Sequence, residues 1–255
     1  MILLLLLAVV VWIYVKGGVL LGIAATIVYL FFLYDKKYAS LCNIIARSKY
    51  GKGQTQEAMK YFERSYKKGM NINQRITYSY YLLREGKPNE AEDILNRLLA
   101  FKLPPDIKNL AKSYHALVLM KTDRSEEALE ELLEIFPTFK TTNMYGSIGF
   151  LYVQMGKLEE AEKFNLEAYD FNSDDPIILD NLVQLYNQKG EYEKAFAYVE
   201  ELMQKSPSFI EAYYDAAVCT KALGKTELFN EYIEKAKTIK TTFLSHVTHE
   251  DVAKL

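Results

Sequence analysis

The chain has 255 residues, half of them apolar, and a formal net charge of −2 at pH 7. A chain of this length buries a substantial core, and its near-neutral charge argues against a nucleic-acid partner, whose phosphates need a dense basic surface. Cys42 and Cys219 lie far apart without metal-ligand spacing, so we expect no disulfide framework and assign both to the core.

Residues 1–34 form an apolar block in which Lys16 is the one charged residue. A run this apolar is typical of a membrane-spanning segment. A single straight helix over the whole block would be about 51 Å long, against about 30 Å of hydrocarbon. The pair Gly17-Gly18 therefore favours a helical hairpin of residues 1–15 and 19–34. In the alternative, the second run spans alone and the first lies at the interface.

The expected membrane anchor covers residues 1–37, and the basic residues after it predict its orientation. Lys36, Lys37 and Arg47 outweigh the lone Lys16, which favours a cell-membrane protein with its remaining domain in the cytoplasm. The opposite side stays open, because large domains translocate largely regardless of charge. A cleaved signal peptide is not expected, since no basic residue precedes the apolar run.

A pattern of glycine, four residues and alanine recurs through the rest of the chain. It occurs at Gly53/Ala58, Gly86/Ala91, Gly156/Ala161 and Gly190/Ala195. Asp123/Ala128 occupies the same frame, because Asp tolerates the turn conformation that Gly supplies, and Gly224 continues the series. The separations of 33, 37, 33, 34 and 34 residues predict six helix-turn-helix units.

Each period shows two short amphipathic helices around the turn. In the fourth period the first helix carries Tyr145-x2-Ile148-Gly149-x2-Tyr152, and in the first period the second helix carries Ala58-x3-Phe62. These residues resemble the tetratricopeptide repeat (TPR), whose pattern is W-x2-L-G-x2-Y followed by A-x3-F and P. The resemblance covers about residues 39–243. It implies an all-α superhelical solenoid of about six TPR-like repeats, preceded here by one or two transmembrane helices.

Small residues recur seven positions before most of the turns and predict close contact between the two helices of a unit. They are Ala46, Ser79, Ala116, Gly149 and Ala217, with Val183 as the exception. Two other features depart from the family pattern. Asn165 replaces an aromatic residue in the fourth repeat, and the longest separation surrounds Leu103-Pro104-Pro105-Asp106. There we expect a longer loop, with Asp106 as a helix cap.

We therefore predict a solenoid domain over residues 38–243 and a C-terminal capping turn or tail over residues 244–255. In the tail, Thr248 and Asp251 have the spacing of a helix cap, and the segment is suited to cover the apolar face of the sixth repeat.

No pattern in the chain predicts catalysis. The glycines lack the context of a phosphate-binding loop, and His246, His249 and Glu250 have the order HxxHE rather than the metalloprotease order HExxH. His115 is interpreted as a structural residue. We expect no enzyme activity, no cofactor, no metal and no small-molecule substrate.

The resemblance implies that the first helices of successive repeats line a concave groove that holds a peptide. We accordingly expect a membrane-anchored, non-catalytic scaffold or adaptor that binds a protein or peptide partner and contacts the lipid bilayer through residues 1–34. The alternative is a regulatory or sensory subunit of a membrane enzyme or secretion complex. The predicted groove residues are Asn43, Arg47, Tyr50, Asn73, Tyr80, Arg84, Asn143, Phe150, Gln154, Asp180, Gln184, Asn187, Tyr214 and Lys221.

Overall fold

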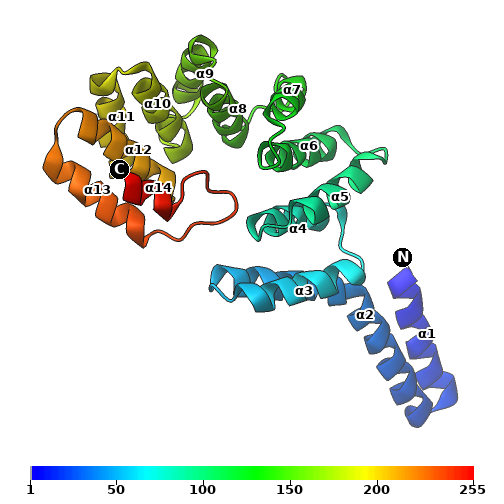
Figure 1. Ribbon diagram of the computed structural model, residues 1–255. Coiled ribbons are helices and arrows are strands. Elements are labelled where there is room, and N and C mark those ends of the chain that lie inside the picture. The colour runs from blue at the N-terminus through cyan, green and yellow to red at the C-terminus, as the bar shows by residue number, and fades with distance from the viewer. Residues whose placement is uncertain (1) are drawn as a thin grey trace. The chain divides into compact units, whose positions relative to one another are not determined.

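The computed structural model describes the backbone of residues 2–255 and the side chains of residues 6–30 and 37–255. These residues form fourteen α-helices and no strand, as the sequence predicted (Figure 1). The chain divides into two compact units, Met1–Arg75 and Ile76–Leu255, and helix α4 (Ile72–Arg84) crosses the division.

The first unit begins with two helices joined at one residue. Helix α1 (Ile2–Gly17) ends before Gly18, whose φ of 81° is a conformation that glycine adopts at low cost, and α2 (Val19–Gly51) follows at once. The hairpin predicted from Gly17-Gly18 is therefore present as a pair of helices. Its second helix is much longer than predicted, because α2 continues into the first repeat and pairs there with α3 (Thr55–Lys67).

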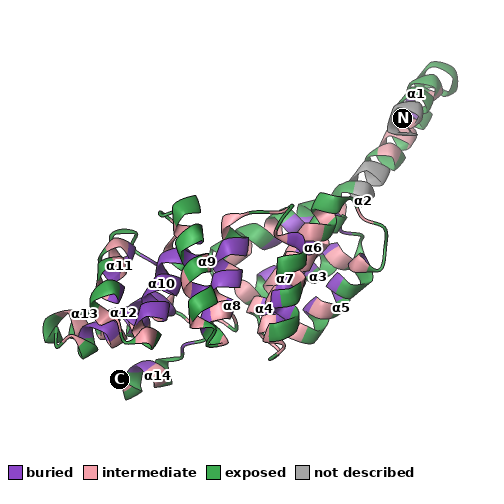
Figure 2. Cartoon of the chain, turned by 90° about the horizontal axis from the view of Figure 1, so that it is seen from above, coloured by how far each residue is buried: buried purple, intermediate pink, exposed green. Residues whose placement is uncertain are grey.

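A glycine allows the two arms of this hairpin to approach closely. A Cβ atom on Gly22 would lie 2.2 Å from a ring carbon of Tyr14, so no larger residue fits there. The Thr26 hydroxyl donates a hydrogen bond of 3.2 Å to the Tyr14 hydroxyl. The hairpin is thus closed by specific packing, although most of its other apolar side chains are exposed (Figure 2).

The prediction of one or two transmembrane helices is not supported. Among the described residues, no helix has the combination of length and apolar character needed to cross a bilayer. The 16 residues of α1 rise about 24 Å, less than the roughly 30 Å of hydrocarbon. In α2 the apolar stretch passes without a break into the polar helix of the first repeat.

The second unit stacks antiparallel helix pairs, one pair per predicted repeat (Figure 1). Helices α5 to α13 are α5 (Pro88–Leu99), α6 (Pro105–Met120), α7 (Ser125–Ile135), α8 (Thr142–Gln154), α9 (Leu158–Phe171), α10 (Pro176–Lys189), α11 (Tyr192–Gln204), α12 (Ile210–Ala222) and α13 (Thr226–Thr238).

All six predicted turn anchors adopt the left-handed backbone conformation. The five glycines have φ between 68° and 75°, and Asp123, in the same frame, has φ 58°. Left-handed geometry costs little for Gly and is tolerated by Asp, so the sequence pattern identified each turn by its physical requirement. The six helix-turn-helix units are confirmed.

Small residues bring the two helices of each unit together, as predicted. Ala58, Ala91, Ala128, Ala161 and Ala195 are fully buried. At Gly149 a Cβ atom would lie 2.0 Å from Oδ1 of Asn165, so the departure at Asn165 is matched by the smallest residue on the facing helix. The Asn165 amide donates to the carbonyls of Gly149 and Ala161, and it accepts from Asn181.

The prediction that Asp106 caps a helix is wrong. Helix α6 begins at Pro105, with Pro104 in the capping position and Asp106 inside the first turn. Proline is already suited to the first helical position, because its φ is fixed and it lacks the N–H group that would otherwise need a partner.

The chain ends in a short helix, α14 (His249–Lys254), that begins with the predicted cap. The Thr248 side chain accepts from the Asp251 backbone, and the Asp251 carboxylate accepts from the Thr248 backbone N–H. Val247 and Val252 join the apolar core of the last two repeats. The segment therefore covers that core, as a terminal unit of a solenoid must.

Candidate functional site

Residues 240–248 leave the last repeat and return across the inner face of the second unit (Figure 1). The backbone N–H of Phe243 donates to the carbonyl of Arg84 at 3.4 Å, and the Phe243 ring lies against Gly86. Nζ of Lys121 donates to the carbonyl of Ser245 at 3.2 Å. The segment thus contacts helices that precede it by more than 100 residues.

His246 lies at the centre of this crossing. Its backbone N–H donates to Oε1 of Glu211 at 2.8 Å, and its ring lies 4.9 Å from the ring of Phe150, centroid to centroid. Beyond it, Nζ of Lys221 donates to the carbonyl of Leu255 at 2.5 Å. Side chains from α8 and α12 therefore hold the C-terminal part of the chain, at His246 and at Leu255, by a ring contact and by hydrogen bonds to its backbone.

Three carboxyl groups lie together on the first helices of the last two repeats. Asp180 on α10 and Glu211 and Asp215 on α12 are 7%, 6% and 6% exposed. Burial first, and then the Glu211 carboxylate, raises the pKa of Asp215 to about 8. Burial and the neighbouring Asp215 and Glu211 raise the pKa of Asp180 well above its ordinary value.

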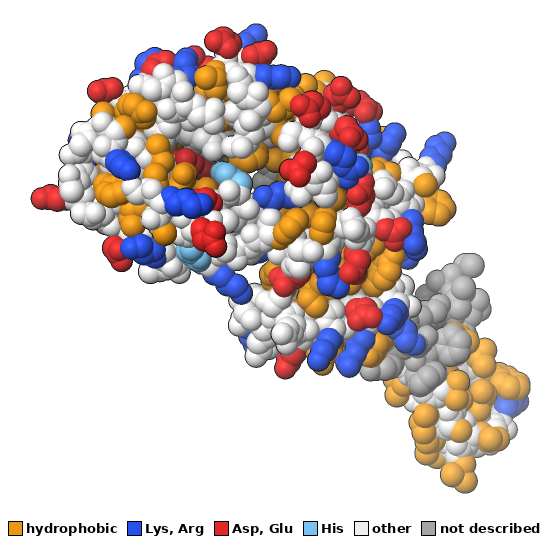
Figure 3. Space-filling view, in the orientation of Figure 1, with side chains coloured by type: hydrophobic (Ala, Val, Ile, Leu, Met, Phe, Trp, Pro, Cys, Tyr) orange, Lys and Arg blue, Asp and Glu red, His pale blue; other side chains and the backbone are white. Residues whose placement is uncertain are grey.

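Two basic groups near this cluster, Lys121 and His246, interact electrostatically with Glu211. Burial lowers the pKa of Lys121, and Glu211 partly opposes that shift. Burial also lowers the pKa of His246, again against the effect of Glu211. Figure 3, which looks into the hollow, shows acidic and histidine atoms inside it. The site thus combines the buried carboxyl cluster of Asp180, Glu211 and Asp215 with a covering segment, residues 240–248, that carries the neutral His246.

Comparison with known proteins identifies the fold of the stacked helix pairs. A sequence profile of the tetratricopeptide repeat matches residues 142–175, which include α8 and α9. A tetratricopeptide repeat protein from Parabacteroides merdae superposes with a TM-score of 0.70 at 16% identity, over 99% of this chain and 96% of that one. The chain has the tetratricopeptide-repeat fold.

Two further solved structures share the TPR fold at low sequence identity. PilW, described as a widely conserved type IV pilus biogenesis factor, has a TM-score of 0.63 at 16% identity, over 79% of this chain and 93% of its own. Pseudomonas aeruginosa PilF has a TM-score of 0.59 at 15% identity, over 80% and 92%. A search of curated protein sequences finds no match. These identities show the fold alone.

The predicted TPR groove residues of the second unit fall into two groups. Arg84, Phe150 and Lys221 bond or touch residues 243–255, and the pKa of Tyr214 is raised by burial, with contributions from Asp215 and Asp251. Other members are not in these contacts. Tyr80 packs against Tyr114, Gln184 is half-buried, and Asn143 and Gln154 are exposed.

The remaining predicted groove residues belong to the first unit. Asn43 is buried and its Nδ2 has no hydrogen-bond partner among the side chains and backbone that the structure describes, whereas Arg47 and Asn73 are exposed and Tyr50 is half-buried. Their role in binding stays a prediction.

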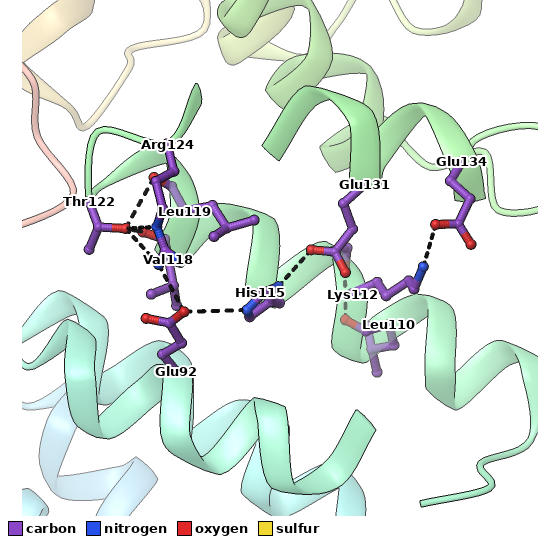
Figure 4. Close-up of polar contacts among 11 residues, drawn as sticks. Glu92, Leu110, Lys112, His115, Val118, Leu119, Thr122, Arg124, Glu131 and Glu134 are labelled. Atoms are coloured by element: carbon purple, nitrogen blue, oxygen red, sulfur yellow. Dashed lines mark hydrogen bonds and ion pairs between the residues drawn. The ribbon is translucent and has the colours of Figure 1, made fainter. Parts of the chain in front are cut away.

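His115 connects repeats, consistent with its interpretation as a structural residue (Figure 4). Its Nδ1 lies 2.7 Å from Oε2 of Glu131 on α7, and its Nε2 lies 3.8 Å from Oε1 of Glu92 on α5. Arg124 donates to the same Glu92 oxygen at 2.8 Å. The network joins α5 and α7 through α6 and does not extend into the acidic cluster.

The groove list did not include Asp215, Lys121 or His246. One signal for Asp215 was available, because Glu211 and Asp215 are one helical turn apart and no basic residue lies one turn from either on that helix. His246 was considered for metal binding together with His249. In the structure the two side chains have different neighbours, since Nε2 of His249 lies 2.9 Å from the carbonyl of Ile239 and the His246 ring lies beside Phe150.

The buried carboxyl groups predict an unusual pH dependence of stability. The pKa of Asp215 is about 8 in the folded chain and near its ordinary value of 3.8 in the unfolded chain, so between these values the folded state holds a proton that the unfolded state has lost. The free energy of unfolding should therefore fall as pH rises through this window, by up to about 1.4 kcal/mol per pH unit for each such group.

In urea denaturation between about pH 6.5 and pH 8, the double variant Asp180→Asn/Asp215→Asn should no longer show this loss of stability. His246, whose pKa burial lowers, is present in both proteins, so the difference between their profiles reports on the aspartates. The control Glu159→Gln/Glu160→Gln removes two exposed carboxylates from α9 and should keep it. If the free energy of unfolding changed with pH in the same way in the wild type and the double variant, the raised pKa values of the buried aspartates would be contradicted.

Proposed function

We propose that this protein is a non-catalytic interaction scaffold that binds an extended segment of a protein partner in the TPR groove. One observation carries the proposal: the groove of the second unit already holds a non-helical segment of its own chain, residues 240–248, which makes a turn at Phe243-Leu244. Glu211 and Arg84 bond its backbone, and Phe150 contacts a side chain. Backbone hydrogen bonds combined with aromatic contacts are a general way of binding extended peptides.

Site-specific photo-crosslinking in cells tests the groove. A benzoylphenylalanine at Gln184, a half-buried residue on the same helix as Asp180, should yield an adduct with a protein partner. The matched position Glu160, exposed on the second helix of its repeat, should not yield that adduct. Equal adducts from both positions, or adducts from Glu160 alone, would place the partner on another surface.

We further propose that the apolar hairpin holds the scaffold at the cell membrane, with the repeats in the cytoplasm. Apolar side chains are exposed on both arms: Leu7, Val9, Val11, Trp12 and Val15 on α1, and Val19, Leu20, Leu21, Ile23, Ile27, Val28 and Leu30 on α2. A continuous apolar surface of this kind marks contact with a membrane or a protein.

The form of the hairpin supports entry into a bilayer from one side. It lacks the charged face with which amphipathic helices lie flat in the interface, because Lys16 is the one charged residue in residues 1–34. We infer that the hairpin inserts turn first and leaves both ends on the side where Lys37 and Arg47 lie. Basic residues next to an apolar segment favour the cytoplasmic side.

Trp12 is the one tryptophan of the chain and reports directly on this insertion. Its side chain is 63% exposed, so its emission should shift to shorter wavelength when full-length protein meets vesicles of phosphatidylcholine and phosphatidylglycerol. The variant Val15→Asp/Leu20→Asp places charges on both arms, each costing about 2.5–3.5 kcal/mol within a bilayer, and should abolish the shift. An unchanged spectrum for the wild type, or an equal shift for the variant, would rule out insertion.

A further inference from the structure

Three buried acceptor atoms in the groove have no hydrogen-bond partner among the described residues. They are Oδ1 of Asp180, Oδ2 of Asp215 and Oδ1 of Asn187. Their side chains lie close together, because Asn187 donates from its Nδ2 to the carbonyl of Asp215 at 2.8 Å and the Asp215 carboxyl contributes to the raised pKa of Asp180. A buried acceptor without a donor is costly, and native structures retain few of them.

The described residues supply no cation to this pair. The charged groups that act on Asp180 are the carboxyls of Asp215 and Glu211, and Glu211 is the charged group that acts on Asp215. The nearby basic residues, Lys121 and His246, interact with Glu211 instead. The groove therefore has two acidic side chains and an amide oxygen without a partner among the described residues. Below about pH 8 a proton on Asp215 neutralises its charge, and a bound cation would take the place of that proton.

We propose that Asp180, Asp215 and Asn187 receive one arginine or lysine side chain of the protein partner, and that residues 240–248 cover this site until the partner displaces them. The proposal rests on the groove-binding function proposed above and names the chemistry of the partner. This acidic site would bind a cation, whereas a basic groove would bind a carboxylate.

The arrangement of the acceptors favours a guanidinium or ammonium group over a metal ion. Within the part of the chain that the structure describes, no three acidic, histidine or cysteine side chains lie close enough to hold a metal. A guanidinium presents five N–H donors spread over a planar fork, and an ammonium presents three. Such donors can reach acceptors on two helices, and charge-assisted hydrogen bonds of this kind are the strong ones.

The covering segment is suited to leave. Its central contact with the acidic cluster is the hydrogen bond from the His246 backbone to Glu211. Residues 241, 242, 244 and 245 are only half-buried, and Phe243 and His246 are exposed. Removing it would expose the carboxyl cluster to an incoming cation, with Phe150 and Tyr214 alongside. The tether keeps the segment at high effective concentration, so a partner must gain more from the acidic site than the segment does.

Selection of peptides on the full-length chain tests the site. The probe is a phage-displayed library of random nonapeptides, panned on the wild type, on Asp180→Asn/Asp215→Asn and on the control Glu159→Gln/Glu160→Gln. Wild type and control should enrich arginine or lysine at one fixed position, by about tenfold over its neighbours. The Asn variant, which keeps the side-chain shapes, should lose that preference and keep the others.

The outcomes separate the two proposals. Peptides that bind without a preferred basic position, or a preference that persists in the Asn variant, would overturn the cation site and leave groove binding intact. A library that yields no peptide on any of the three proteins would count against groove binding itself.

A second measurement tests the cation site without a partner. His246→Arg places a guanidinium beside Glu211, and His246→Gln is its neutral control. At pH 8 the Arg variant should have a Tm about 2–4 °C above that of the Gln variant. The difference should become clearly smaller when Asp180→Asn/Asp215→Asn is added, and what remains is the contribution of Glu211. No difference in the wild-type background, or the same difference in both, would show that the aspartates do not accept a cation.

Discussion

The close approach of two helices within each repeat is the constraint on which the rest of this structure depends. In the first four units a buried alanine of the second helix faces a small residue of the first, and in all six a left-handed residue makes the turn between them. Because this geometry recurs every 33 to 37 residues, successive first helices present side chains to the same inner face. A larger residue at Gly149 would strike Asn165 and disturb two repeats at once.

Stacking of this kind allows the inner face to carry groups that are costly to bury. Asp180 and Asp215 lie on helices whose apolar residues, including Leu182 and Ala216, are fully buried in the same core. The packing of that core offsets the desolvation of the carboxyls, and the covering segment withholds them from water. Burying these acceptors without a donor costs free energy in the free protein. We infer that binding of a cation removes this cost and so contributes to the affinity for the partner.

Much of the fold was predictable, because the signals are local. Left-handed turns favour Gly or Asp, and tight helix pairs need small residues. Local residues such as Gly53, Asp123 and Ala161 were therefore enough to predict the turns and the helix pairs. The binding site was less predictable, because it depends on distant contacts. Lys121 meets Ser245 across 124 positions, and no periodicity marks that pairing. The hairpin and its break at Gly17-Gly18 were evident from the sequence. The prediction of transmembrane helices was not supported, because no described helix combines the length and the apolar character of a membrane span, and α2 continues into the polar first repeat.

The central claim is that residues 240–248 occupy the groove in the free protein. The most direct measurement is the amide hydrogen exchange of His246 in the full-length chain without a partner. The backbone N–H of this residue donates to a carboxylate that is 6% exposed, so we predict exchange at least about 100-fold slower than in an unfolded chain. Exchange of that amide at the unfolded rate would contradict the account, because the groove would then be open.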